Sequence, residues 1–194
     1  LLDDVMPALE AVHGQGYLHR DLKPSNLYIR SADGRVMLID FGAARQALGR
    51  RTRSVTSVVT PGYSPIEQYV TVGDDYGPWT DIYAIGACMY ACMQGYPPNE
   101  APQRLEKDRI ATALTRLRGV YSDNLIEVVE WCMSLDPLSR PQSVFVLQKE
   151  LSREGERQYT KLSVGEKVRL GFDNMLTDTK KNLKRATCLG TRIR

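Results

Sequence analysis

The sequence predicts a mainly α-helical fold with one short β-hairpin, and three features of the 194-residue chain support this. Apolar residues recur at helical spacing near the N-terminus and again after residue 123. Residues 81–93 are apolar at nearly every position, which indicates a buried central helix. Two short runs of branched and aromatic residues flank an Asp-Gly turn, which is typical of a hairpin.

The first predicted helix covers residues 2–12. Its apolar positions are Leu2, Val5, Met6, Leu9 and Val12. Pro7 falls inside this pattern and predicts a kink or a later helix start, while Gly14 and Gly16 supply stop signals. His13 has no evident partner in the sequence, so we expect it on the surface.

The predicted hairpin pairs residues 27–29 with residues 36–39 through the turn Ser31–Gly34. The strand after the turn ends at Asp40. Residues 43–63 are rich in Arg, Ser and Thr and show no periodicity, so we expect one long exposed loop there.

Four helices are predicted in the second half of the chain. The central one, residues 81–93, is closed by Gly95 and the prolines that follow. A weaker pattern predicts a helix over 104–118. Asp123 is the expected cap of the next helix, and Pro137 and Pro141 separate that helix from a last one over 143–151.

Composition and charge divide the chain into two parts. Residues 1–151 hold 15 basic and 18 acidic side chains, whereas residues 152–194 hold 11 basic and 5 acidic ones. We expect a globular domain over 1–151 and a basic extension over 152–194, either a solvated tail or a segment attracted to anionic membrane surfaces. The four cysteines lack metal-ligand spacing and indicate free thiols in a reducing compartment. No feature indicates nucleic-acid binding.

The candidate chemistry lies in the segment 19–26 (HRDLKPSN) and in Asp40, which ends the predicted hairpin. Asp21 can orient and deprotonate an attacking hydroxyl, and the carbonyl of Asn26, five residues later, can bind a metal ion. Asp40 is placed to bridge a divalent cation to phosphates. Lys23 adds positive charge where negative charge develops on a transferring phosphate. These residue types together are what phosphoryl transfer requires.

These residues resemble the catalytic loop and the Asp-Phe-Gly magnesium motif, here Asp40, Phe41 and Gly42, of eukaryotic-like Ser/Thr protein kinases of the bacterial type. Four later motifs extend the resemblance in the same order over about 120 residues. They are Thr60–Tyr63, the variant Ala-Pro-Glu motif Pro65–Glu67, Asp81–Gly86 and Arg140-Pro141. The resemblance implies a kinase-like large C-terminal lobe, with ATP and protein substrates as ligands and Mg²⁺, or alternatively Mn²⁺, as the metal.

The resemblance also assigns roles to individual residues. Thr60 would hydrogen-bond Asp21 and Lys23 and favour Ser or Thr acceptors. Tyr28 and Ile39 would lie at the floor of the adenine site, although the family has an aliphatic residue where Tyr28 stands. Structural roles are expected for a further group of residues: His19 packing under Phe41, Gly42 in the turn, Asp81 holding the catalytic loop, and Glu67 paired with Arg140.

Regulation is the next implication. Arg20 directly precedes Asp21, as in kinases that are controlled through phosphorylation of their activation loop, and a loop phosphate would pair with Arg20. The acceptor candidates are Thr52, Ser54, Thr56 and Ser57. The alternative is that this Ser- and Thr-rich segment is simply polar.

Only eighteen residues precede His19, and they contain neither a Gly-rich phosphate loop nor an ATP-pairing lysine. We therefore expect the sheet-rich N-terminal lobe of the family to be absent from these residues, and the isolated chain to transfer negligible phosphate. Apolar surface at Leu18, Phe41 and the strand 27–29 would then be exposed and favour self-association. We expect a cytoplasmic domain, in a parent protein that is either soluble or anchored to the inner membrane.

Two other functions share some of these features. A small-molecule phosphotransferase shares the Asp and Asn spacing, but Lys23, Phe41 and the segment after Thr60 speak against it. A pseudokinase that acts as a binding scaffold is the alternative of a different class, and the presence of Asp21, Asn26 and Asp40 together speaks against a decayed site.

Overall fold

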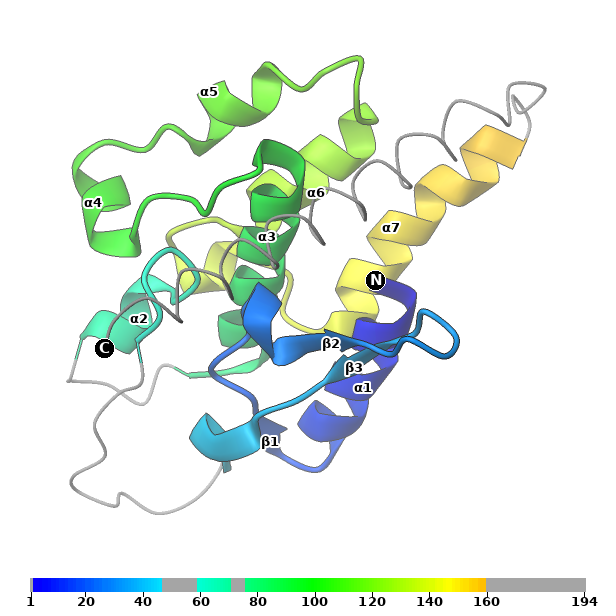
Figure 1. Cartoon of the computed structure of the whole chain (residues 1–194). Coiled ribbons are helices and arrows are strands. Elements are labelled where there is room, and N and C mark those ends of the chain that lie inside the picture. Colours follow the sequence, from blue (N-terminus) through cyan, green and yellow to red (C-terminus); the bar gives the residue numbers. More distant parts are fainter. Residues whose placement is uncertain (1, 47–58, 71–75, 160–194) are drawn as a thin grey trace, which may run out of the picture. The chain divides into compact units, whose positions relative to one another are not determined.

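The computed structural model describes residues 2–46, 59–70 and 76–159 (Figure 1). The described chain is mainly helical, as the sequence predicts, but it has two small two-stranded sheets where the sequence predicts a single hairpin. The described residues up to 153 belong to one compact unit. The predicted extension 152–194 lies largely outside the described residues, so its proposed membrane contact stays a prediction. In the described part, no helix is both long and apolar enough to span a membrane.

Helix α3 (Pro78–Gln94) is the centre of the core, and eleven of its residues, Thr80 to Tyr90, are buried. Gly77 and Pro78 begin it three residues before the predicted start, because proline suits the first turn of a helix. Gly95, in the left-handed conformation at φ 82°, ends it where the sequence predicts. Helix α6 (Asp123–Cys132) packs directly against α3.

Helix α1 (Leu2–Gly14) buries Val5, Met6 and Leu9 against this core and confirms the first predicted helix. The helix continues through Pro7 and does not start after it. Pro7 lies in the second turn, where the missing N–H removes only one backbone hydrogen bond, and burial of the apolar face offsets that loss.

The predicted hairpin is confirmed as β2 (Leu27–Ile29) and β3 (Val36–Leu38), paired antiparallel with Leu27 opposite Leu38. The predicted loop 43–63 is partly wrong. A short strand, β4 (Arg45–Gln46), pairs with β1 (Tyr17–Leu18), and a 3₁₀ turn, η2 (Phe41–Ala43), precedes it. Two-residue strands carry too little pattern to be found in a sequence. Residues 47–58 lie outside the described residues.

The predicted helix 104–118 is wrong, because the chain forms two short helices, α4 (Ala101–Glu106) and α5 (Ile110–Thr115). Asp108 lies between them. Its carboxylate accepts hydrogen bonds from the backbone N–H of Ile110 and from the guanidinium of Arg104, which holds the chain in a turn. In Figure 1, α4 and α5 lie on the other side of α3 from the β2–β3 hairpin.

Two further boundaries differ from the prediction. Ser122, not Asp123, caps α6, since its hydroxyl accepts the N–H of Leu125. After the 3₁₀ turn η3 (Pro137–Ser139), helix α7 runs from Val144 to Tyr159, eight residues past the predicted end. A short helix that was not predicted, α2 (Ile66–Tyr69), follows the described turn at 60–64.

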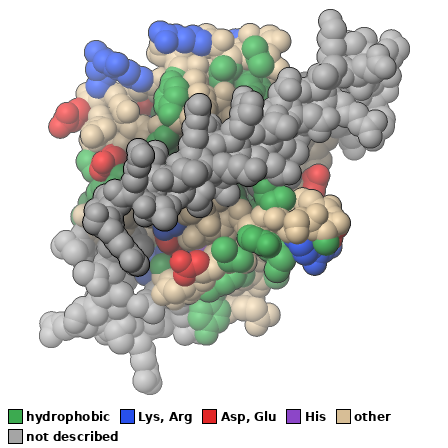
Figure 2. Space-filling view, in the orientation of Figure 1, with side chains coloured by type: hydrophobic (Ala, Val, Ile, Leu, Met, Phe, Trp, Pro, Cys, Tyr) green, Lys and Arg blue, Asp and Glu red, His purple; other side chains and the backbone are tan. Residues whose placement is uncertain are grey.

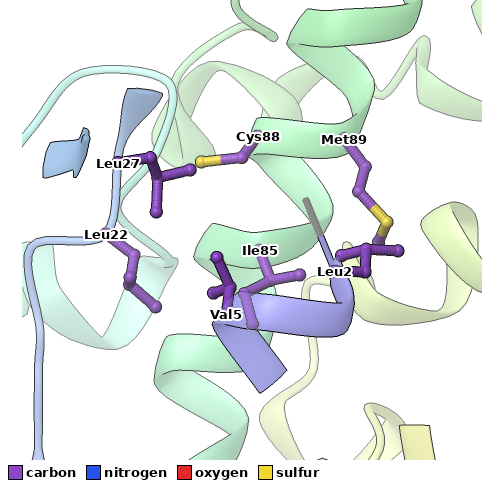
Figure 3. A pocket seen from close by; sticks show the side chains of 7 residues that line it. All are labelled: Leu2, Val5, Leu22, Leu27, Ile85, Cys88 and Met89. Atoms are coloured by element: carbon purple, nitrogen blue, oxygen red, sulfur yellow. The ribbon is translucent and has the colours of Figure 1, made fainter. Parts of the chain in front are cut away.

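The core also anchors the segment that carries the candidate chemistry (Figure 3). Leu22, inside the loop from Asp21 to Asn26, and Leu27, directly after it, point toward Ile85 and Cys88 of α3 and Val5 of α1. The apolar pocket among these side chains has a volume of about 10 Å³, no more than one water molecule occupies. The loop is therefore fastened to α1 and α3 by close apolar packing.

The expected exposed surface needs one correction. Leu18 is only 2% exposed, because the β1–β4 pair places it in the interior, whereas Phe41 is 45% exposed. Beside Phe41, exposed apolar side chains on the outer face of the hairpin include Tyr28 and Met37, which are cross-strand partners. Figure 2 shows hydrophobic side chains gathered over this part of the molecule.

Candidate active site

The loop from His19 to Asn26 is held by a buried carboxylate at the start of α3. Asp81 accepts the backbone N–H of His19 at 2.8 Å and that of Arg20 at 2.8 Å. Arg20 has φ 66°, a left-handed conformation that costs a non-glycine residue about 1–3 kcal/mol. The side chain of Gln68 donates to the carbonyl of Arg20 at 2.8 Å. Asp81 and Gln68 therefore secure the strained turn immediately before Asp21.

His13 is not a surface residue without a partner, so that expectation was wrong. Its Nε2 lies 2.8 Å from Oδ2 of Asp81, and the His13 side chain is only 9% exposed. The partner is 68 residues away in the sequence, so only the packing of α1 beside α3 reveals the contact. Asp81 thus joins α1, α3 and the loop.

The buried ring of His19 connects this loop to the end of the hairpin. The backbone N–H of Asp21 donates to Nδ1 of His19, so the ring proton must be on Nε2, which then donates to the carbonyl of Ile39 at 3.1 Å. The ring of Phe41 lies over His19 with centroids 4.8 Å apart. His19 is therefore a neutral packing residue that links Asp21 to the segment of Asp40.

Asp21 is at the centre of the site, with only 8% of its surface exposed. Its Oδ1 accepts the hydroxyl of Thr60 at 2.7 Å, and its Oδ2 accepts Nζ of Lys23 at 2.7 Å. Lys23 also lies 3.5 Å from the Thr60 hydroxyl. Burial raises the pKa of Asp21, but the hydrogen bonds from Lys23 and Thr60 outweigh it and hold the pKa below the ordinary value. Asp21 is thus ionised and able to accept a proton.

Asn26 and Asp40 are brought to one end of the hairpin by its register. The backbone N–H of Ile39 donates to the carbonyl of Asn26, which adds one more backbone hydrogen bond to those that pair β2 with β3. Asp40 is the next residue, and its φ is 62°. The amide nitrogen of Asn26 donates to Asp21, which leaves its carbonyl oxygen without a donor in the described chain. An amide oxygen and a carboxylate are ligands that suit Mg²⁺.

Among the described residues, no group of three or more His, Cys, Asp or Glu side chains is arranged to hold a metal ion by itself. The pair Asn26 and Asp40 fits a magnesium ion whose remaining ligands are phosphate and water oxygens, since Mg²⁺ usually keeps few protein ligands. Gly42 N donates to Oδ1 of Asp40 at 3.2 Å and orients the carboxylate.

The residues expected near adenine lie on the outer face of the hairpin. Tyr28 is 52% exposed and Ile39 is 38% exposed. Alternation along the strands places Tyr28, Met37 and Ile39 on the same face, with Phe41 beyond them. This face is apolar and lies beside Asp40.

The segment from Thr60 to Gln68 is locked in place by an ion pair. Arg140 is 1% exposed, and its guanidinium donates to both carboxylate oxygens of Glu67 at 2.7 and 3.1 Å. The other three N–H groups donate to the backbone carbonyls of Ser134, Trp79 and Leu135. All five donors of the guanidinium are therefore satisfied.

The loop residues expected to be phosphorylated, Thr52, Ser54, Thr56 and Ser57, lie outside the described residues. Arg20, their expected partner, stacks its guanidinium on the ring of Tyr76, 4.3 Å from the centroid. Nε of Arg20 is buried and makes no hydrogen bond in the described chain. Sequence reasoning missed Tyr76, Gln68 and His13, because each acts through a contact distant in sequence.

Comparison with known proteins shows which family this chain resembles. The sequence model described as "Protein kinase domain" matches residues 1–152. The Nostoc sp. serine/threonine-protein kinase PknA is 38% identical over 106 residues, 52% of this chain and 18% of that protein. Serine/threonine-protein kinase F of Synechocystis sp. is 39% identical over 94 residues, 46% of this chain and 18% of that protein.

Similarity extends to eukaryotic proteins and to a solved structure. The serine/threonine-protein kinase STE20 of Candida glabrata is 29% identical over 164 residues, 82% of this chain and 18% of that protein. The solved structure described as "PpkA-294 apo form" is 31% identical, with a TM-score of 0.65 over 78% of this chain and 52% of that one. The chain thus spans about a fifth of these curated relatives and about half of the solved chain.

Proposed function

This chain belongs to the protein kinase family, and we propose that it carries the phosphoryl-transfer residues of a Ser/Thr kinase that moves the γ-phosphate of ATP to protein hydroxyls. The observation that supports this best is the Asp21 carboxylate, which is shared between the Thr60 hydroxyl and the Lys23 ammonium. A carboxylate, a cation and a hydroxyl are thereby gathered beside a pair of metal-ligand candidates.

In the proposed reaction, the substrate hydroxyl lies beside Asp21, and Asp21 orients it and accepts its proton. Lys23 stabilises the negative charge that develops on the transferring phosphoryl group. Thr60 keeps the carboxylate in one orientation and borders the acceptor. Asn26 and Asp40 would hold Mg²⁺, which supplies neutralisation of the phosphate charge when bound.

Regulation is proposed to act through Arg20. Its guanidinium lies against Tyr76 and has a buried N–H without an acceptor, and a phosphate on the segment of Thr56 and Ser57 would supply one. Such a pair would order the segment that leads to Thr60. Replacing Arg20 with alanine should then remove the difference in activity between the phosphorylated and the dephosphorylated protein.

The proposed function is tested in the full-length protein by measuring phosphate transfer from radiolabelled ATP to a mixed Ser, Thr and Tyr peptide substrate. Asp21→Asn should lower kcat by about 10²–10⁴-fold because the proton acceptor is lost. Asp123→Asn, at an exposed position with a similar change, is the control. Equal activity of Asp21→Asn and wild type would refute the assignment, and phosphotyrosine as the main product would refute the substrate class.

The isolated residues 1–194 are proposed to bind magnesium-ATP weakly and to transfer negligible phosphate, because they contain no Gly-rich phosphate loop and no ATP-pairing lysine. Rapid phosphorylation of the peptide substrate by this chain alone would contradict the proposal. Magnesium-dependent ATP binding by the full-length protein, lost in Asp40→Asn, separates a kinase from a scaffold that does not bind nucleotide.

A further inference from the structure

A second hollow of about 250 Å³ lies beyond the candidate active site, between the end of α3 and the helices α4 and α5. Its lining is mixed in character, with two tyrosines, polar residues and three arginines. The residues that matter below are Tyr90, Tyr96, Arg104, Asp108, Arg109 and Arg116. The family resemblance assigned this region no role.

The hollow carries a net positive charge. The carboxylate of Asp108 is already used, since Oδ1 and Oδ2 both accept from the buried guanidinium of Arg104 and Oδ1 also accepts from Ile110 N. Burial raises the pKa of Asp108, but the hydrogen bonds from Arg104 lower it further, so this carboxylate stays ionised and paired. It therefore offsets Arg104 and no other charge.

Arg109 and Arg116 supply the net positive charge of the hollow. Both are exposed, and their guanidinium groups form no ion pair or hydrogen bond within the described chain. In Figure 2, Lys and Arg side chains gather at the edge of the molecule where α5 lies. Two free guanidinium groups at the rim of one hollow suit carboxylates, which they can bind through paired hydrogen bonds.

Aromatic surface forms another wall of the hollow. Tyr90 is buried and lies edge-on to Tyr96, with ring centroids 6.3 Å apart, and Tyr96 is 55% exposed. An exposed tyrosine beside free arginines is a combination enriched where proteins bind other proteins. The hollow thus offers both charge and apolar contact to a peptide.

The hollow is connected to the candidate active site by direct packing. Thr60, whose hydroxyl reaches Asp21, is followed by Gly62, where an added Cβ would lie 2.7 Å from the carbonyl oxygen of Pro98. Pro98 lies between Tyr96 and Asn99, and both of these residues line the hollow. The hollow is therefore lined by residues adjacent in sequence to Pro98, which packs against the segment that carries Thr60.

We propose that the hollow between α3, α4 and α5 is a docking site for an acidic segment of the protein substrate, held by Arg109 and Arg116 against Tyr96. The proposal rests on the proposed function, because the substrate whose hydroxyl lies at Asp21 provides the acidic segment. It adds a substrate preference for Asp and Glu at a distance from the acceptor.

The test measures binding of a fluorescein-labelled peptide with one Ser and an Asp- and Glu-rich segment to the full 194-residue chain by fluorescence anisotropy. The double variant Arg109→Gln/Arg116→Gln should bind about tenfold more weakly, because two charge-assisted contacts are lost. The control variant Lys107→Gln/Lys149→Gln removes the same charge at exposed positions that do not line the hollow. It should bind as the wild type does.

A second peptide, with Asn and Gln in place of Asp and Glu, should bind weakly and equally to all three proteins. Equal affinity of wild type and Arg109→Gln/Arg116→Gln for the acidic peptide would overturn the docking site. An equally large loss of affinity in the control variant would also overturn it. So would a result in which the double variant loses affinity for anionic phospholipid vesicles but not for the acidic peptide. None of these results depends on activity, so each leaves the proposed phosphoryl transfer intact.

In the full-length kinase, the same double variant should raise KM for the acidic substrate about tenfold and leave kcat unchanged, because ground-state and transition-state binding are lost equally. A fall in kcat without a change in KM would overturn the docking role. Circular dichroism of the variant should match that of wild type, since both arginines are exposed.

Discussion

At the scale of single residues, two side chains that hold the candidate site together, Asp21 and Arg140, have fully used hydrogen-bonding groups. Asp21 is shared by Lys23, Thr60 and Asn26, and Arg140 uses all five of its donors. Groups satisfied in this way have one orientation, because every alternative leaves a buried polar atom unpaired. The two predictions at this scale concern these residues.

The first prediction concerns acid stability and Asp21. Its folded pKa lies below the ordinary value of 3.8, so its contribution to stability is complete above pH 3.8 and is lost as the pH falls through the folded value. The free energy of unfolding of Asp21→Asn should therefore fall less between pH 5 and about pH 3 than that of wild type, in urea titrations followed by circular dichroism.

Thr60 provides a matched pair for this measurement. Thr60→Val removes a donor to Asp21 and should reduce the same pH dependence in part, whereas Thr60→Ser keeps the hydroxyl and should behave as wild type. Parallel curves for wild type and Asp21→Asn would show that the carboxylate is not stabilised as the geometry indicates.

The second prediction concerns the buried pair of Glu67 and Arg140. Arg140→Met leaves the Glu67 carboxylate without its cation and should lower the free energy of unfolding by about 3–5 kcal/mol. Arg140→Lys should lie between this variant and wild type, since lysine has three donors where arginine has five.

Arg118→Met is the control in urea unfolding, because Arg118 pairs with Asp123 at the surface and such pairs contribute about 0–1 kcal/mol. If Arg140→Met cost no more than Arg118→Met, the pair would not hold the Thr60–Gln68 segment.

At the scale of elements, α3 organises the molecule. It holds the loop from His19 to Asn26 through Asp81, receives Leu22 and Leu27 on its flank, and packs closely against α6. The close approach requires glycine at position 86. An added Cβ at Gly86 would lie 2.6 Å from the Cβ of Cys132 and 2.9 Å from the Cγ of Met133.

The third prediction follows from this contact. Gly86→Ala should destabilise the protein by about 1–3 kcal/mol, because overpacking between α3 and α6 outweighs the better helix propensity of alanine. Gly14→Ala is the control, since no atom lies within 4 Å of its added Cβ. Thermal unfolding that gave the two variants the same Tm would contradict close packing of α3 against α6.

At the scale of the whole molecule, the described residues up to 153 carry the candidate site beside an apolar outer face of the β2–β3 hairpin. We define this hairpin face by Tyr28, Met37, Ile39 and Phe41, which are between 38% and 52% exposed. Apolar side chains grouped on one face favour association when nothing covers them.

The fourth prediction concerns self-association of the 194-residue chain through the hairpin face. Sedimentation velocity should show a concentration-dependent dimer that Met37→Glu weakens by about tenfold or more, because a buried carboxylate is costly in an apolar contact. Val120→Glu, at an apolar position that is 74% exposed but lies away from the hairpin, should leave the dimer unchanged. A monomer at all concentrations would refute the prediction.

Much of the fold could be predicted because its strongest elements carry strong local patterns. The apolar run of α3, the amphipathic α1 and the Asp-Gly turn of the hairpin are each visible within about a dozen residues. The errors in the element boundaries have local causes, because the sequence pattern does not show which of several possible hydrogen bonds will form. Asp108 divides the predicted helix 104–118 because its carboxylate finds both Arg104 and Ile110 N, and Ser122 caps α6 in place of its neighbour Asp123.

The sequence by itself determined which residues form the candidate site, since Asp21, Lys23, Asn26 and Asp40 are identified by residue type and spacing. Only the tertiary structure decided what holds them, namely Asp81 with His13, Gln68 at the strained Arg20, and the neutral tautomer of His19. The tertiary structure also decided which arginines form ion pairs. Arg104 and Arg140 pair with carboxylates, whereas Arg109 and Arg116 form no ion pair within the described chain. Residue types and their spacing are visible along the sequence. Burial and contacts between residues distant in sequence arise only when the helices pack together.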